Sequence, residues 1–299
     1  MKFYKVSLFL FCFVIYLPTV FAQESVNFRT YVEEKLQTYD RRTQVNGKWQ
    51  TTKGIKLSEV CDVDENIVAE RVFADYGAIF VAAFANPNIK FPNKCVFSET
   101  EAQDYQTKAN PMSYTLGGVP ITLQKPAMES LLAAVKEAGT KNLRISPRGS
   151  SESASRSYQD TIRLWNSRFL PALNYWVGKG KIKRDTAETV KQMQINDQVA
   201  QVLEWEKARL WFSKDLSKSI LYSVAAPGAS QHIFMLALDV EQFSNKQVRD
   251  ILAKHGWFQT VQSDLPHFTY LGVEESSLPA LGLKSVNVSG QKFWIPNLD

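Results

Sequence analysis

The strongest constraint on this chain is a pair of short polar motifs, each next to an apolar segment. The first, GASQHIFMLALD, contains His232 and Asp239, and the second, SDLPHF, contains Asp264 and His267. Together they hold two of the only three histidines in 299 residues. Histidine and carboxylate side chains are the usual ligands of a catalytic zinc ion. A fold that brings the two motifs together would therefore create a metal site.

The spacing of His232 and Asp239 requires a bend in the chain. A straight strand would separate them by roughly 20 Å or more, and a helix by about 10 Å. We therefore expect His232 in a loop and Asp239 on a following strand. In the second motif the proline disfavours helix at the preceding residue, so a turn or extended segment can direct Asp264 and His267 to one site. Each motif on its own is more typical of a histidine that is simply hydrogen-bonded in the core.

The first 22 residues are typical of a secretory signal peptide. Two lysines precede an apolar core that ends near Pro18, and Ala22 supplies a small residue before a cut at Gln23. An uncleaved membrane anchor is the alternative, but the apolar run is short for a span. We expect an exported protein, periplasmic or secreted, with no transmembrane segment after signal cleavage.

The charge of the mature chain is nearly balanced. Cleavage would remove two of the 35 Lys and Arg residues and none of the 30 Asp and Glu residues, which leaves 33 basic against 30 acidic side chains. A dedicated nucleic-acid-binding protein usually has a concentrated basic excess, so we expect no nucleic-acid partner.

Two cysteines, Cys61 and Cys95, remain after signal cleavage. In an oxidising compartment an isolated pair is best interpreted as one disulfide. A two-cysteine metal site is the weaker alternative, since the spacing resembles no zinc motif.

The remaining pattern predicts an α+β fold, in which a small antiparallel sheet with flanking helices carries the metal site. A composition shift at Gly117-Gly118 divides the mature chain into residues 23–117, a helical or mixed region without obvious chemistry, and residues 118–299, which contain both motifs. The expected helices cover 28–39, 126–139, 158–176, 184–213 and 245–255, and one more helix begins after its cap at Asp64 and ends near Gly77. The expected strands cover 78–84, 121–123, 143–145, 234–240, 257–261 and 268–271. His255 lies at a helix end and is interpreted as structural.

Three short patterns occur in order along the second part: Arg156-Ser157-Tyr158, then Ser230-x-His232 with Ala237-x-Asp239, then Asp264-x-x-His267-Phe268. Together they resemble the zinc site of the D-alanyl-D-alanine carboxypeptidase family, which is grouped with lysostaphin-type and hedgehog-type metallopeptidases. The resemblance covers about residues 117–272. The chain departs from the family pattern at three positions: Met235 stands where glycine is usual, Asp264 where glutamate is commoner, and Pro266 where tryptophan is usual.

The resemblance implies a secreted zinc metallopeptidase that cleaves peptidoglycan stem peptides, as a D-alanyl-D-alanine carboxypeptidase or a related endopeptidase of the cell wall. It implies one zinc ion per chain, held by His232, Asp239 and His267, with Asp264 as the general base. Arg156 would pair with the developing oxyanion or with a substrate carboxylate.

Two further residues belong to the implied substrate site. Arg148 lies in the same Ser/Gly-rich loop as Arg156 and is the alternative to it, and Ser230 would hydrogen-bond substrate near the metal. Two other function classes remain open: a zinc-containing but inactive cell-wall or protein-binding module, and a secreted structural protein with coincidental motifs. The patterns do not distinguish a carboxypeptidase from an endopeptidase, and they do not predict the oligomeric state.

Overall fold

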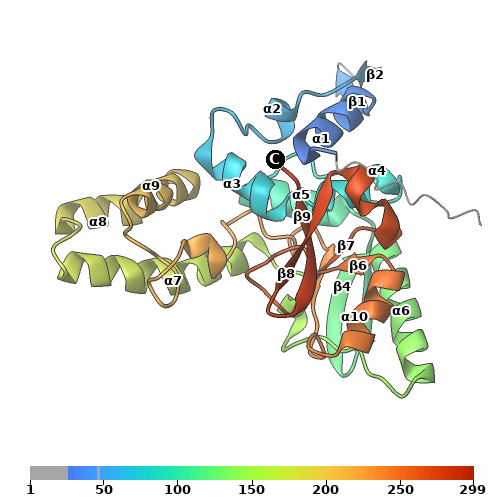
Figure 1. Ribbon diagram of the computed structural model, residues 1–299. Coiled ribbons are helices and arrows are strands. Elements are labelled where there is room, and N and C mark those ends of the chain that lie inside the picture. The colour runs from blue at the N-terminus through green and yellow to red at the C-terminus, as the bar shows by residue number, and fades with distance from the viewer. Residues whose placement is uncertain (1–25, 46–47) are drawn as a thin grey trace, which may run out of the picture.

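The computed structural model describes residues 26–45 and 48–299 (Figure 1). The predicted signal peptide lies outside these residues. The elements of the N-terminal part are α1 (Phe28–Gln37), β1 (Asp40–Val45), β2 (Lys48–Lys53), α2 (Leu57–Val60), α3 (Ile67–Tyr76), α4 (Ile79–Ala85), α5 (Glu99–Lys108) and β3 (Pro111–Leu116). Those that follow are β4 (Val119–Gln124), α6 (Lys125–Thr140), α7 (Tyr158–Gly178), α8 (Arg184–Lys191), α9 (Ile195–Lys207), β5 (Ala237–Asp239), α10 (Lys246–Lys254), β6 (Trp257–Phe258), β7 (His267–Tyr270), β8 (Leu283–Val288) and β9 (Gln291–Pro296), with short 3-10 turns at Ser151–Ser153, Ile220–Tyr222 and Glu275–Leu281.

A three-stranded antiparallel sheet with the order β5-β7-β6 positions the two motifs. Asp239 at the end of β5 is the register partner of His267 at the start of β7. Helix α10 packs against α6 and against the edge strand β6 (Figure 1). The predicted α+β class, with a small antiparallel sheet and flanking helices, is therefore confirmed.

Helices α7, α8 and α9 form an arm that extends away from the sheet (Figure 1). Large aromatic side chains fill its interior: the ring centroids of Trp165 and Phe169 are 6.2 Å apart, and those of Phe169 and Phe212 are also 6.2 Å apart. All three side chains are buried. The prediction of one helix over 184–213 is wrong, because the chain turns between α8 and α9, and α8 packs against both α7 and α9.

Three other local predictions are wrong for physical reasons. The apolar run 78–84 forms helix α4 instead of a strand; it is buried on all sides, so it has no polar alternation that would separate the two structures. Residues 143–145 form no strand. The segment that follows them makes an isolated antiparallel bridge, from Pro147 to Val240, just after β5. The cap of α3 is Asn66, because Asp64 pairs with Arg29 instead.

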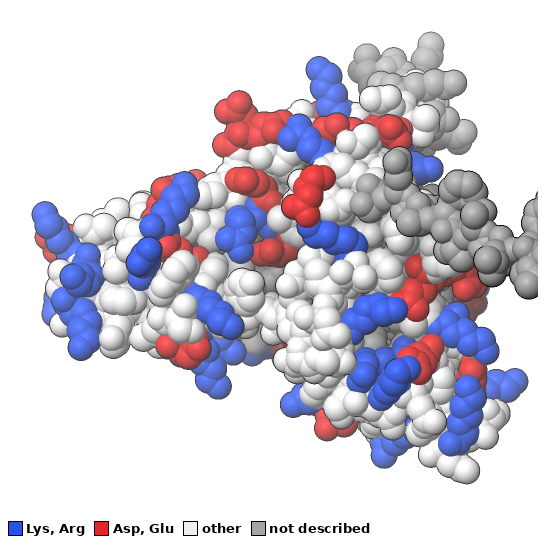
Figure 2. Space-filling model, viewed as in Figure 1, with Lys and Arg blue, Asp and Glu red and all other residues white. Residues whose placement is uncertain are grey.

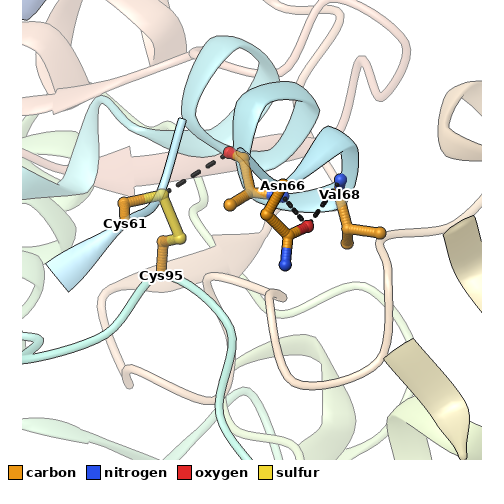
Figure 3. Close-up of a disulfide and its surroundings, with 5 residues drawn as sticks. Cys61, Asn66, Val68 and Cys95 are labelled. Carbon is orange, nitrogen blue, oxygen red and sulfur yellow. Dashed lines mark hydrogen bonds between the residues drawn. A yellow bond between two sulfur atoms is a disulfide. The ribbon is translucent and has the colours of Figure 1, made fainter. Parts of the chain in front are cut away.

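The predicted disulfide between Cys61 and Cys95 is present, with the two Cα atoms 5.2 Å apart (Figure 3). Cys61 follows α2, and Cys95 lies in the segment before α5. The bridge lies next to the first turn of α3, where the Asn66 side chain accepts hydrogen bonds from two backbone N–H groups. Closing a loop of this length stabilises the fold by about 3 to 4 kcal/mol in the chain-entropy model. A disulfide is also compatible with export.

The two parts of the chain on either side of Gly117-Gly118 share one core. These two glycines form the turn of the hairpin between β3 and β4. Across the predicted boundary the rings of Phe97 and Phe234 lie 5.0 Å apart. The N-terminal part is thus packed directly against the segment that carries His232.

Basic and acidic side chains lie close together over much of the visible surface (Figure 2). On α10, for example, Lys246 pairs with Asp250, and Lys254 pairs with Glu137 of α6. Within the described ranges, no helix has the length and hydropathy needed to cross a bilayer.

Candidate metal centre

His232, Asp239 and His267 converge in the interior of the protein. His232 Nε2 is 3.2 Å from His267 Nδ1 and 3.4 Å from Asp239 Oδ1, and the third side of this triangle, from His267 Nδ1 to Asp239 Oδ1, is 3.3 Å. Both histidines are at most 5% exposed. The group could hold a metal ion.

A tight turn before β5 allows His232 to face Asp239. The expected strand over 234–240 is shorter than predicted, because the backbone turns at Met235, whose N–H donates to the His232 carbonyl at 3.2 Å. Met235 has φ = 53°, a left-handed conformation that glycine adopts at little cost. The prediction that His232 lies in a loop and Asp239 on a strand is therefore confirmed.

Gly228 starts this segment and fits where no other residue would. Its φ is 83°, and a Cβ atom there would lie 2.0 Å from the carbonyl oxygen of Phe97. The Phe97 N–H donates to the Gly228 carbonyl at 2.9 Å. This close backbone contact fixes the start of the loop against the N-terminal part.

The left-handed turn gives a stability prediction for Met235. We expect Met235→Gly to be more stable than Met235→Ala by about 1 kcal/mol, because both variants lose the buried side chain but only alanine has a strained Cβ. Met128, which is buried inside α6, is the matched control, and there the alanine variant should be the more stable of the pair by about 1 kcal/mol. Urea denaturation of the four variants measures both differences. Equal stability of the two Met235 variants would contradict the strained turn.

Each of the three converging side chains has a hydrogen-bond partner on its outer side. Asp239 Oδ2 accepts from Arg156 Nη2 at 3.0 Å. His232 Nδ1 lies 3.4 Å from the Ala154 carbonyl, and His267 Nε2 lies 2.8 Å from Gln231 Oε1. Both partners of the histidines are acceptors, so each outer nitrogen carries the proton and each inner nitrogen has a lone pair.

The inner side of the triangle therefore contains only acceptors. Burial lowers the pKa of His232 to about 4, so this imidazole is neutral at physiological pH. Asp239 is a carboxylate, and its other oxygen, Oδ2, pairs with the Arg156 guanidinium at 3.0 Å. Two imidazole nitrogens and one carboxylate oxygen thus face one another, an arrangement that a cation stabilises.

Asp264 is partly buried, and its carboxylate interacts electrostatically with His267 and Asp239 of the triangle. It begins a turn in which the His267 N–H donates to its backbone carbonyl at 3.2 Å, as expected for a segment that avoids helix. Within the described residues its carboxylate accepts no hydrogen bond. Burial raises its pKa, the nearby His267 lowers it, and the charge of Asp239 raises it further. The structure therefore brings a carboxylate with a raised pKa to the candidate metal site.

The predicted substrate-binding residues occupy different places. Arg156 is held in the site: besides its bond to Asp239, its Nε donates to the Glu152 carbonyl at 3.0 Å. Arg148 has an exposed side chain over the Phe243 ring, and only its backbone N–H contacts Asp239, at the carbonyl oxygen. Ser230 is buried, and its hydroxyl makes no hydrogen bond within the described residues. The third histidine, His255, lies at the end of α10, as predicted, and it pairs with Glu137 at 2.9 Å.

Two glutamines that the sequence patterns did not indicate hold the site together. Gln231 contacts His267, as described above. Gln106 of α5 donates from Nε2 to the carbonyl oxygens of Arg156 at 2.8 Å and of Ile233 at 3.0 Å, which joins the two loops of the site. The only signal in the sequence is that Gln231 directly precedes His232. Gln106 has no such signal.

A cavity of about 340 Å³ opens beside Arg156. It is lined by polar and small side chains together with Met235: Gln106, Thr107, Pro111, Thr122, Ser155, Arg156 and Ser157. Comparison of the sequence with models of known protein families and with curated proteins finds no match.

Proposed function

We propose that this chain is a secreted, zinc-dependent peptidase that cleaves the stem peptides of peptidoglycan. The observation that carries the proposal is the triangle of His232, Asp239 and His267 with the Asp264 carboxylate beside it. The peptidoglycan substrate rests on the resemblance of the three sequence patterns to the D-alanyl-D-alanine carboxypeptidase family.

The donor set fits zinc. Three ligand atoms at about 2.0 to 2.1 Å from a tetrahedral zinc ion lie about 3.3 to 3.4 Å from one another, which matches the triangle. Two imidazoles and one carboxylate leave a fourth position open for catalysis, and each of the three has the outer hydrogen bond that orients a metal ligand. When bound, zinc supplies Lewis-acid chemistry that makes water more acidic and polarises a carbonyl group.

Asp264 transfers protons, and Arg156 positions Asp239 and the substrate. Asp264 accepts a proton from the water whose oxygen attacks the peptide carbonyl carbon, and it donates that proton to the amine as the C–N bond breaks. Arg156 keeps Asp239 in place through Nη2, and its Nη1 is free within the described residues to meet a substrate oxygen in the adjoining cavity. Because its pKa is raised, the Asp264 carboxyl group holds the proton taken from water more readily than an ordinary aspartate does, and it can then donate that proton to the amine.

Digestion of defined muropeptides tests the proposal. We expect the purified mature protein to release one peptide fragment or a terminal D-alanine, to lose this activity with a chelator, and to regain it with zinc. Mass spectrometry of the products identifies the cleaved bond, which also separates a carboxypeptidase from an endopeptidase. Zinc-loaded, folded protein that cleaves no muropeptide would contradict the enzymatic proposal and favour an inactive binding module.

A further inference from the structure

The outer nitrogen of His267 is held by a buried amide. Gln231 is 1% exposed, and its Oε1 accepts the Nε2–H of His267 at 2.8 Å. Gln231 directly precedes His232 in the chain. One loop therefore supplies one candidate ligand and also the group that orients the other.

The hydrogen-bond partners of the Gln231 amide determine which end is the oxygen and which is the nitrogen. Gln231 Nε2 donates to the backbone carbonyl of Tyr76, the last residue of α3, at 2.9 Å. A carbonyl oxygen can only accept, so the NH2 end of the amide must face Tyr76 and its oxygen must face His267. The N-terminal part of the chain thus sets which end of Gln231 meets the histidine.

Two threonine hydroxyls complete this buried network. Thr269 Oγ1 donates to Gln231 Oε1, and the hydroxyls of Thr269 and Thr260 lie 2.6 Å apart. Thr269 is two residues after His267 on β7, so both side chains project from the same face of the strand. Both threonines are at most 1% exposed, so water does not replace these contacts.

We propose that Gln231 is a positioning residue that keeps the Nδ1 lone pair of His267 free for the metal. The same contacts give α3 of the N-terminal part a role, because the carbonyl of its last residue, Tyr76, anchors the amide. Without the oxygen of Gln231, the Nε2–H of His267 would be buried without an acceptor. The imidazole would then rotate or shift its proton to Nδ1, which faces the other two ligand atoms. This inference rests on the proposed metal centre.

Zinc affinity of variants of the full mature chain tests the role of Gln231. We expect Gln231→Met, which has a similar shape but no acceptor, to weaken zinc binding by about 10- to 100-fold. Gln231→Glu should restore most of the affinity, because it keeps an oxygen for His267 and, as a neutral acid, can still donate to the Tyr76 carbonyl. The matched control is Gln198→Met in α9, where a buried amide that bonds Trp165 and Val190 is lost and zinc affinity should not change.

The imidazole nitrogen chemical shifts of zinc-free protein provide a second readout. They should show the Nε2–H tautomer of His267 in the parent and lose that preference in Gln231→Met. Zinc binding within twofold of the parent, together with an unchanged tautomer, would overturn the role of Gln231 alone. A parent protein that binds no zinc would instead reject the metal centre, and the tautomer measurement would still report on the contact. Circular dichroism identifies a variant that has not folded, and Gln231→Glu then carries the test.

Discussion

Asp264→Asn should lower the turnover of muropeptide cleavage by about 10²-fold or more and leave the fold and zinc content unchanged. Asparagine has almost the same shape but cannot accept the proton of the attacking water. Substrate affinity should change little, since the lost step is proton transfer. Asp264→Glu should keep part of the activity, because a longer carboxylate can still reach the water. Steady-state kinetics of the three proteins measures these effects.

The pH profile gives an independent test of the same carboxylate. Because burial raises the pKa of Asp264, its proton is bound up to a higher pH than in an ordinary aspartate. Activity should therefore fall as the pH decreases through this raised pKa, and the residual activity of Asp264→Asn should lack that acidic limb.

Asp75→Asn is the matched control for Asp264→Asn. Asp75 is another partly buried carboxylate with a pKa raised by burial, but it pairs with Arg71. This variant should keep normal turnover. Undiminished cleavage by Asp264→Asn would show that the base lies elsewhere, and loss of zinc from that variant would make Asp264 a ligand.

Replacement of either candidate histidine ligand should remove the metal. We expect His232→Ala or His267→Ala to weaken zinc binding by about 10²- to 10³-fold, because each deletes one of three protein ligands. The double variant should retain no zinc after dialysis. Competition with a chromophoric chelator measures the affinity of each protein.

His255→Ala is the control for these variants. It removes the remaining histidine, which pairs with Glu137 at the end of α10 and does not face the triangle. It should bind zinc like the parent. Full zinc occupancy in the double variant of His232 and His267 would reject the proposed centre.

The sequence predicted the elements with strong periodicity and missed those without it. Helices α6, α7 and α10 have clear apolar faces and end signals, and their bounds agree closely with the prediction. Helix α4 is apolar on every side, so its residues cannot distinguish helix from strand. Strand β5 is shorter than expected, because Met235 adopts a left-handed backbone conformation. This conformation is uncommon for residues other than glycine, so a methionine does not predict it.

The residue types of the candidate ligands could be recognised in the sequence. The contacts that depend on the path of the backbone could not be predicted from it. The motifs indicated the two histidines, and the structure brings them together with Asp239. The partner of Gln231 is a backbone carbonyl 155 positions earlier in the chain, and no residue pattern marks such an acceptor. Similarly, the contact of Arg156 with Asp239 spans 83 positions and depends on how the loop before α7 folds over β5.

Anomalous diffraction at the zinc absorption edge, from crystals of the mature protein grown with zinc, tests the central claim most directly. We predict one peak per chain, about 2.0 to 2.2 Å from His232 Nε2, His267 Nδ1 and an Asp239 carboxylate oxygen. The peak should vanish below the edge and be absent from the double histidine variant. Zinc bound at other side chains, or no peak between these three residues at saturating zinc, would contradict the account.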